Sequence, residues 1–188
     1  MPRLFTALEI PADVRSVISG ARGGLPGARW IDPENYHVTL RFIGDVDESI
    51  AREVAFILGQ VRREVFEIKL DSLSVFGGNR PRAIVALVAP NPQLVELQAE
   101  HERLMRRIGL EPEGRKFTPH VTLARLRNSS SHQVAEYFSS RGHFRAPLFE
   151  AERFVLFSSR DSVGGGPYVV EADYPFLETM TPMRQARR

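Results

Sequence analysis

Apolar residues along the first half of the chain alternate between short runs typical of strands and spacings typical of helices. The runs 4–10, 37–43 and 66–76 predict three strands. The apolar positions of the two helices predicted between them are Val14, Val17 and Ile18, and then Ile50, Val54, Ile57, Leu58 and Val61. Pro11 suits the first helical turn, and Asp45 or Asp47 can cap the second helix.

The second half repeats this order. Runs at 83–88, from His120 onward, at 149–157 and at 168–172 predict strands. A helix capped by Asn91, with Pro92 in its first turn, carries an apolar face formed by Leu94, Leu97, Leu104 and Ile108. We expect an ion pair between Glu102 and Arg106 on this helix, and its end at Gly109. Ser129 to Ser131 can cap a further helix through Tyr137 and Phe138.

Each half therefore has the order strand, helix, strand, helix, strand. The helix-opening proline precedes the second predicted strand by similar distances, 26 positions from Pro11 to His37 (37 − 11) and 28 from Pro92 to His120 (120 − 92). This match indicates a duplication. We predict an α+β fold of two pseudo-symmetric lobes of mainly antiparallel sheet flanked by helices around a central cleft. It forms one domain over 1–177, with repeat halves at about 3–78 and 81–175 and a frayed tail at 178–188.

Composition limits the class of protein further. Hydrophobic residues make up 43% of the chain, enough to bury the core of one medium domain. The absence of cysteine excludes disulfides, a thiol nucleophile and cysteine-ligated metals. The N-terminus lacks a long apolar signal region, and no apolar stretch approaches the ~20 residues needed to span a bilayer. We expect a soluble cytoplasmic protein.

Charge says less about the partner. The net charge is only +2. Of the 25 basic residues, 23 are arginine, and the other two are Lys69 and Lys116. Arginine's planar fork suits phosphate contacts, although genome base composition explains the same bias. A nearly neutral chain fits the end of a nucleic acid better than a long duplex footprint.

The tetrapeptide His-Val-Thr-Leu occurs twice, at 37–40 and at 120–123. On a strand, the histidine and threonine of each copy project to one face while the valine and leucine point to the core. One copy alone is more often a structural histidine. Two copies in matching contexts favour a cleft in which one imidazole acts as a general base and the other as a general acid on a single phosphate.

Other kinds of site fit the sequence less well. Two histidines could ligate zinc, but catalytic zinc usually takes three protein ligands, and Asp45 at the turn is the one acidic neighbour suitably placed. The glycine run 164–166 lacks the Lys-Ser/Thr of a nucleotide P-loop. His101, His132 and His143 lack matching partners, and we interpret them as surface residues. We predict a site without metal or cofactor.

The paired motifs resemble those of the 2H phosphoesterase superfamily. Trp30, Arg41-Phe42-Ile43-Gly44, Phe117-Thr118-Pro119 and Ala124-Arg125 extend the similarity to the bacterial and archaeal RNA 2′,3′-cyclic phosphodiesterases, also called 2′-5′ RNA ligases. The resemblance spans residues 4 to about 176. It implies a bilobal, metal-free enzyme that hydrolyses a terminal 2′,3′-cyclic phosphate to a 2′-phosphomonoester.

The resemblance also implies roles for individual residues. His37 is the expected proton donor to the leaving 3′ oxygen, and His120 the expected acceptor that activates water. Thr39 and Thr122 would donate hydrogen bonds to the nonbridging phosphate oxygens. By themselves, the identical motifs do not distinguish the acid from the base.

Four substrate-binding candidates are less direct. Arg125 matches the family's phosphate contact, but it lies three residues after Thr122, so a bulge or strand end must return it to the histidine face. Phe42 and Tyr36 could stack on a base, but we expect both side chains to lie in the core. By resemblance, Tyr168 lines the cleft.

The predicted partner is an RNA end that carries a 2′,3′-cyclic phosphate, tRNA fragments included, bound by a monomer away from membranes. ATP-independent 2′-5′ ligation could use the same groups, since it reverses transesterification. Two alternatives stay open from the sequence: a noncatalytic RNA-binding module, and a phosphodiesterase for a small cyclic-phosphate nucleotide.

Overall fold

The computed structural model describes residues 1–141, 143–159 and 166–178. The elements of the first half are β1 (Arg3–Glu9), α1 (Ala12–Ser19), β2 (Ala28–Trp30), the 3-10 helix η1 (Pro33–Asn35), β3 (His37–Asp45), α2 (Glu48–Leu58), β4 (Phe66–Ile68) and β5 (Leu70–Phe76). Those of the second half are β6 (Ala83–Val88), α3 (Pro92–Arg107), β7 (His120–Leu126), α4 (Ser131–Ser139), β8 (Phe149–Ala151), β9 (Arg153–Ser159) and β10 (Val169–Pro175). The α+β class predicted from the sequence is confirmed.

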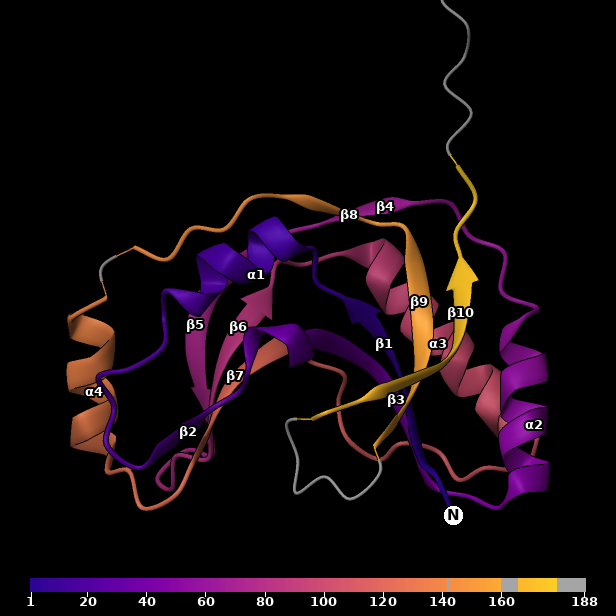
Figure 1. The fold of residues 1–188 in the computed structure, drawn as a ribbon, viewed down its shortest axis with the longest axis horizontal. Helices are drawn as coiled ribbons and strands as arrows, with labels where there is room; N and C mark the ends of the chain where they lie inside the picture. Colours follow the sequence, from indigo (N-terminus) through magenta and orange to yellow (C-terminus); the bar gives the residue numbers. More distant parts are fainter. Residues whose placement is uncertain (142, 160–165, 179–188) are drawn as a thin grey trace, which may run out of the picture.

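The two motif strands lie side by side in the middle of the main sheet. Its strand order is β10-β9-β1-β3-β7-β6-β5, β2 adds to β7, and β4 pairs with β8 in a separate two-stranded sheet. Every pairing between these named strands is antiparallel. In Figure 1, β5, β6 and β7 lie to the left and β1, β3, β9 and β10 to the right. The motif strands therefore form the seam between two similar groups of strands.

The two groups exchange their outer strands. On one side β3 pairs with β1, and β1 pairs with β9 from the second half of the chain. On the other side β7 pairs with β6, and β6 pairs with β5 from the first half. Helix α3 likewise packs on β3. The pseudo-symmetry expected from the sequence is present, but each lobe is built from both halves of the chain.

Two predicted strands are interrupted at equivalent places. The expected strand 66–76 breaks at Lys69 into β4 and β5, and the expected strand 149–157 breaks at Glu152 into β8 and β9. The short pieces then pair with each other, Phe66 opposite Ala151. A single strand would keep both pieces in one sheet, so the break is what lets β4 and β8 leave the main sheet and join the two lobes.

Strand β2 was not expected, because glycines and a proline precede Trp30. It forms because the chain turns sharply at Gly27, which has a positive φ of 79°. A Cβ atom at Gly27 would lie 2.3 Å from the carbonyl oxygen of Arg127, whose backbone N–H donates to the Gly27 carbonyl. Only glycine permits this close approach, which aligns β2 with the end of β7.

The helices begin where the sequence predicts. The side chains of Asp47, Asn91 and Ser130 accept hydrogen bonds from the backbone N–H groups of Ile50, Leu94 and Gln133, respectively. Val17 differs from the prediction, because α1 is short and buries Val14 and Ile18 while Val17 is 46% exposed. Within the described ranges, no helix has the length and apolar character required to cross a membrane.

The interpretation of His101 as a surface residue is wrong. Its side chain is fully buried on α3, on the same face as Leu94, Leu97 and Met105. The Nδ1 atom lies 2.8 Å from the Thr6 hydroxyl, and the ring packs against Phe154. Burial lowers the pKa of His101 to about 3, so the imidazole is neutral and tolerated in the core. His132 and His143 are exposed, as predicted.

Candidate active site

A single bridge between β3 and β7 sets the geometry of the motifs. Val38 lies opposite Val121, and both side chains are fully buried. Because side chains alternate along a strand, the motif histidines and threonines point to the opposite face. One residue to either side of the bridge, this antiparallel register places His37 across from Thr122 and Thr39 across from His120. The four groups form a pseudo-two-fold cluster on one face of the sheet.

A β-bulge follows the threonine in each motif strand. On β3, Ala7 opposes Thr39 but Thr6 opposes Arg41, so Leu40 is the extra residue. On β7, Val85 opposes Thr122 but Ile84 opposes Ala124, so Leu123 is the extra residue. In both strands the residue after the extra leucine is also buried. The normal alternation is shifted by one residue beyond each bulge.

The bulges bring Phe42 and Arg125 onto the face of the motif histidines. These residues are equivalent in the two repeats, each five positions after its histidine, and both are exposed. The sequence predicted that Arg125 could reach the histidine face only after a bulge or a strand end, and the structure contains such a bulge. The expected core position for Phe42 is wrong, since its side chain is 47% exposed. Tyr36, for which we expected the same, is buried at 3% exposure.

Both histidines are held in the same tautomer. The Nδ1 atom of His37 lies 2.9 Å from the carbonyl oxygen of Asn35, and that of His120 lies 2.6 Å from the carbonyl oxygen of Thr118. A carbonyl oxygen only accepts, so each Nδ1 carries the hydrogen. The Nε2 atom of each neutral ring is then left to take or return a proton. In His37 this atom lies 3.0 Å from the Thr39 hydroxyl.

Burial favours the neutral form of both rings. It lowers the pKa of His37 to about 4, and the nearby charges of His120 and Arg125 lower it further against the opposing hydrogen bond to Asn35. Burial also lowers the pKa of His120, again with a contribution from Arg125. A bound phosphate would oppose these shifts, because its negative charge favours the protonated imidazole. Arg125 thus lies close enough to influence both motif histidines.

Aromatic side chains surround His37. Its ring centroid lies 5.1 Å from that of Phe5, 5.2 Å from that of Tyr168 and 6.0 Å from that of Phe157. Phe5 also contacts Phe42 at 5.7 Å. A cavity of about 720 Å³ is lined by Tyr168, Phe157 and Asn35 and extends to the start of α1, where charged side chains such as Asp13 and Arg15 line it. The ring of His37 itself packs among aromatic side chains.

The position of Tyr168 depends on the segment before β10. Gly166 has a φ of +93°, and a Cβ atom there would lie 2.4 Å from the side chain of Asn35. This close approach brings the segment that carries Tyr168 against the residue whose carbonyl orients His37. Gly164 and Gly165, the rest of the glycine run noted in the sequence, lie outside the described residues.

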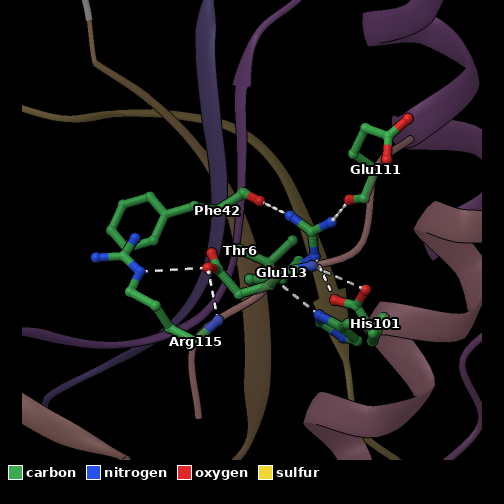
Figure 2. Close-up of polar contacts among 8 residues, drawn as sticks. Thr6, Phe42, His101, Glu111, Glu113 and Arg115 are labelled. Carbon is green, nitrogen blue, oxygen red and sulfur yellow. Dashed lines mark hydrogen bonds and ion pairs between the residues drawn. The ribbon is translucent and has the colours of Figure 1, made fainter. Parts of the chain in front are cut away.

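A buried arginine joins the first motif to the segment that precedes the second. Arg41, 5% exposed, donates from Nε to Glu102 at 2.5 Å and from its terminal nitrogens to the carbonyl oxygens of Phe42 and Glu111. Glu102 also accepts from the backbone N–H of Glu113, which pairs with Arg115. Figure 2 shows this network beside the buried His101. The ion pair expected between Glu102 and Arg106 is replaced by the pair with Arg41.

Sequence reasoning missed several neighbours of the motif histidines. Phe5 and Phe157 come from β1 and β9, and Phe76 on β5 lies 4.7 Å from the ring centroid of His120. Their strands lack a motif that could have identified them. The equivalence of Phe42 and Arg125 was detectable, however, by aligning the two motifs beyond their leucines. Among the residues that the structure describes, no group of three or more metal-ligating side chains was found.

Comparisons with known proteins agree with this arrangement. The family model described as "LigT like Phosphoesterase" matches the chain twice, at residues 8–86 and 87–168. A Bacillus subtilis protein named RNA 2′,3′-cyclic phosphodiesterase is 31% identical over 162 residues, which cover 83% of this chain and 87% of the relative. An Aeropyrum pernix protein of the same name is 39% identical over 111 residues, 58% of this chain and 62% of the relative.

Solved structures show the same fold. The structure of Escherichia coli LigT in complex with 3′-AMP superposes with a TM-score of 0.74 at 24% identity, covering 94% of this chain and 99% of the other. A Thermus thermophilus structure gives a TM-score of 0.72 at 20% identity and covers 92% and 97% of the two chains. With both repeats matched by the family model, this chain belongs to the LigT-like phosphoesterase family.

Proposed function

We propose that this chain is an RNA 2′,3′-cyclic phosphodiesterase that hydrolyses a terminal 2′,3′-cyclic phosphate to a 2′-phosphomonoester. The observation that carries the proposal is the pair of histidines across the β3–β7 seam, each with Nδ1 bonded to a carbonyl and Nε2 free of that bond. Two relatives whose alignments cover more than three-quarters of this chain are named RNA 2′,3′-cyclic phosphodiesterase, which supports the same substrate.

The reaction needs two proton transfers. The water oxygen forms a bond to phosphorus and gives its proton to Nε2 of one histidine, while the bond from phosphorus to the ribose 3′ oxygen breaks and that oxygen takes a proton from the other. By resemblance, His120 accepts and His37 donates. Solvent then restores both protonation states. Attack on the same phosphorus by the 5′ hydroxyl of a second RNA, in place of water, would use the same groups: the bond to the 3′ oxygen breaks and a 2′-5′ linkage forms.

Charge that develops on the phosphate has suitable partners on this face. Thr39 and Thr122 offer hydroxyl donors from the two motif strands, and Arg125 offers a guanidinium returned to the site by the bulge. Preorganised donors of this kind stabilise a transition state because they do not have to reorient during the reaction. These roles, the independence from metal, the cytoplasmic location and the monomeric state remain predictions.

The test uses protein treated with a chelator and an oligoribonucleotide that ends in a 2′,3′-cyclic phosphate. We expect conversion to a terminal 2′-phosphate at a rate unaffected by the chelator, measured by chromatography against 2′- and 3′-phosphate standards. A 3′-phosphate would reverse the proposed regiochemistry. RNA binding without turnover would favour a noncatalytic module, and turnover of small cyclic nucleotides alone would favour that substrate class.

The pH profile of kcat/KM should be bell-shaped, with its maximum on the acid side of 6.5. Activity requires one neutral and one protonated histidine, and it is lost at low pH when both are protonated and at high pH when both are neutral. Because burial lowers both pKa values, both limbs move to lower pH than two ordinary imidazoles would give. Initial rates at low substrate from about pH 4 to about pH 9 would measure this.

The profile of kcat should lie at higher pH than that of kcat/KM, because a bound phosphate raises the pKa of each histidine. A plateau of kcat/KM that continues well above neutrality would contradict the lowered pKa values. The profile has the same shape whichever histidine is the acid, so it tests the pair and not the assignment.

A further inference from the structure

A second arginine lies next to Arg125 on the face of the motif histidines. Arg29 on β2 is the direct cross-strand partner of Arg125 on β7. Its neighbours Ala28 and Trp30 are partly buried and oppose the buried Leu126 and Ala124. Because side chains alternate, Arg29 and Arg125 project together to the other side, and both are exposed there.

This pairing brings two guanidinium groups together on one face of the sheet. Directly opposed residues on antiparallel strands have Cβ atoms about 5 Å apart, so neighbouring phosphates of one nucleic-acid strand can lie within reach of the two side chains. The planar guanidinium group presents paired donors that match phosphate oxygens, so phosphate is the chemistry that fits the pair.

Arg29 lies one strand beyond Arg125 at one end of the site. The bulge of β7 turns Arg125 to the face of the motif histidines, and its charge lowers the pKa of both, so it lies beside the position proposed for the reacting phosphate. The backbone bond from Ile31 to the Leu123 carbonyl holds β2 against the bulge of β7. At the other end, the equivalent bulge presents Phe42. The face thus has a cationic end and an aromatic end.

We propose that Arg29 forms a second phosphate subsite, which binds the phosphate on the 5′ oxygen of the terminal nucleotide. The proposal rests on the proposed function, in which the cyclic phosphate lies between His37 and His120 with Arg125. It makes the preferred substrate an RNA strand, in which this second phosphate is the preceding phosphodiester. A cyclic mononucleotide lacks this group and leaves the subsite empty.

The test compares uridine 2′,3′-cyclic phosphate with and without a 5′-phosphate, for the wild type and Arg29→Gln. The two substrates share the base, the ribose and the reacting bond. We expect the 5′-phosphate to raise the wild-type kcat/KM about tenfold and Arg29→Gln to remove this gain, because a charge-assisted contact is lost. The variant should hydrolyse the unphosphorylated substrate as the wild type does. Arg52→Gln, at an exposed position on α2, is the matched control.

Salt dependence gives a second measure. For short RNA oligonucleotides ending in a 2′-phosphate, Arg29→Gln should reduce the slope of log affinity against log salt by about 0.7, the value for one phosphate contact on a single strand. Arg52→Gln should leave the slope unchanged.

Different failures point to different errors. An equal loss on both substrates would mean that Arg29 acts on the reacting phosphate, and no effect of the 5′-phosphate in the wild type would remove the subsite; either result overturns the proposal. If the wild type hydrolyses neither substrate, the proposed function fails. Calorimetric binding of uridine 2′-phosphate with and without a 5′-phosphate to the wild type and Arg29→Gln then still decides whether Arg29 binds the second phosphate.

Discussion

Replacement of His37 or His120 by glutamine is expected to lower kcat/KM on a cyclic-phosphate RNA end by about 10²- to 10⁴-fold in each case. Each histidine performs one of the two proton transfers of a single step, and glutamine cannot exchange protons near neutral pH. The double variant should be little slower than either single variant, because the effects of groups that act as a unit are not additive. Initial rates under kcat/KM conditions measure all three.

Control variants separate catalysis from folding. Glutamine keeps approximately the size and polarity of the imidazole, so thermal unfolding of both variants should remain close to that of the wild type. His132→Gln is the matched control, because this histidine is 82% exposed on α4. Retention of activity to within a few-fold in either active-site variant would contradict the two-histidine mechanism.

A substrate with a better leaving group should identify the acid. A phosphodiester that releases p-nitrophenolate needs little protonation of its leaving oxygen, so loss of the proton donor matters less there. We expect His37→Gln to lose much less activity on this substrate than His120→Gln does. The opposite order would exchange the two roles, which the symmetric motifs leave open in the sequence.

Replacement of Arg41 by alanine is expected to lower the free energy of unfolding by about 3–5 kcal/mol, the usual cost of removing one partner of a buried ion pair. Arg41 is 5% exposed and Glu102 is 20% exposed, so the remaining carboxylate would stay poorly hydrated. Two carbonyl oxygens, of Phe42 and Glu111, would also lose their donors. Urea unfolding measures this change in free energy, provided that the m-value, the slope of the free energy against urea concentration, is the same for the variant and the wild type.

Two further variants make this prediction specific. Arg3→Ala removes one partner of an exposed pair with Asp45, with side chains 60% and 50% exposed, and should leave the free energy of unfolding close to that of the wild type. Replacing Arg41 and Glu102 together by methionine should recover much of the lost stability, because neither charge is then buried without its partner. A cost for Arg41→Ala no larger than that for Arg3→Ala would show that solvent screens the Arg41 pair.

Much of the local structure was readable in the sequence because its causes are local. The helices start at Asp47, Asn91 and Ser130, where a side-chain oxygen satisfies a free backbone N–H three residues ahead. The helix end near Gly109 and the strands of the two motifs follow from backbone preference and alternation in the same way. The repeated motif also predicted the pseudo-symmetric fold and the face of the histidines.

His101 marks the limit of this reasoning. It lies four positions after Leu97, on the apolar face of the predicted helix, but a histidine without a visible partner was assigned to the surface. Its partner, Thr6, is 95 positions away on β1. A polar side chain becomes acceptable in a core only when a hydrogen bond compensates for lost hydration, and a contact between distant segments is not encoded in a local pattern.

The sequence alone determined the paired histidines and threonines, the starts of three helices and the α+β duplication, because these depend on residue identity and on spacing within one segment. The tertiary structure alone decided the single Val38–Val121 bridge, the exchange of β5 and β9 between lobes and the bulges that expose Phe42 and Arg125. The reason is physical: strand pairing and bulges are settled by hydrogen bonds and packing between segments distant in sequence, which local preferences do not specify.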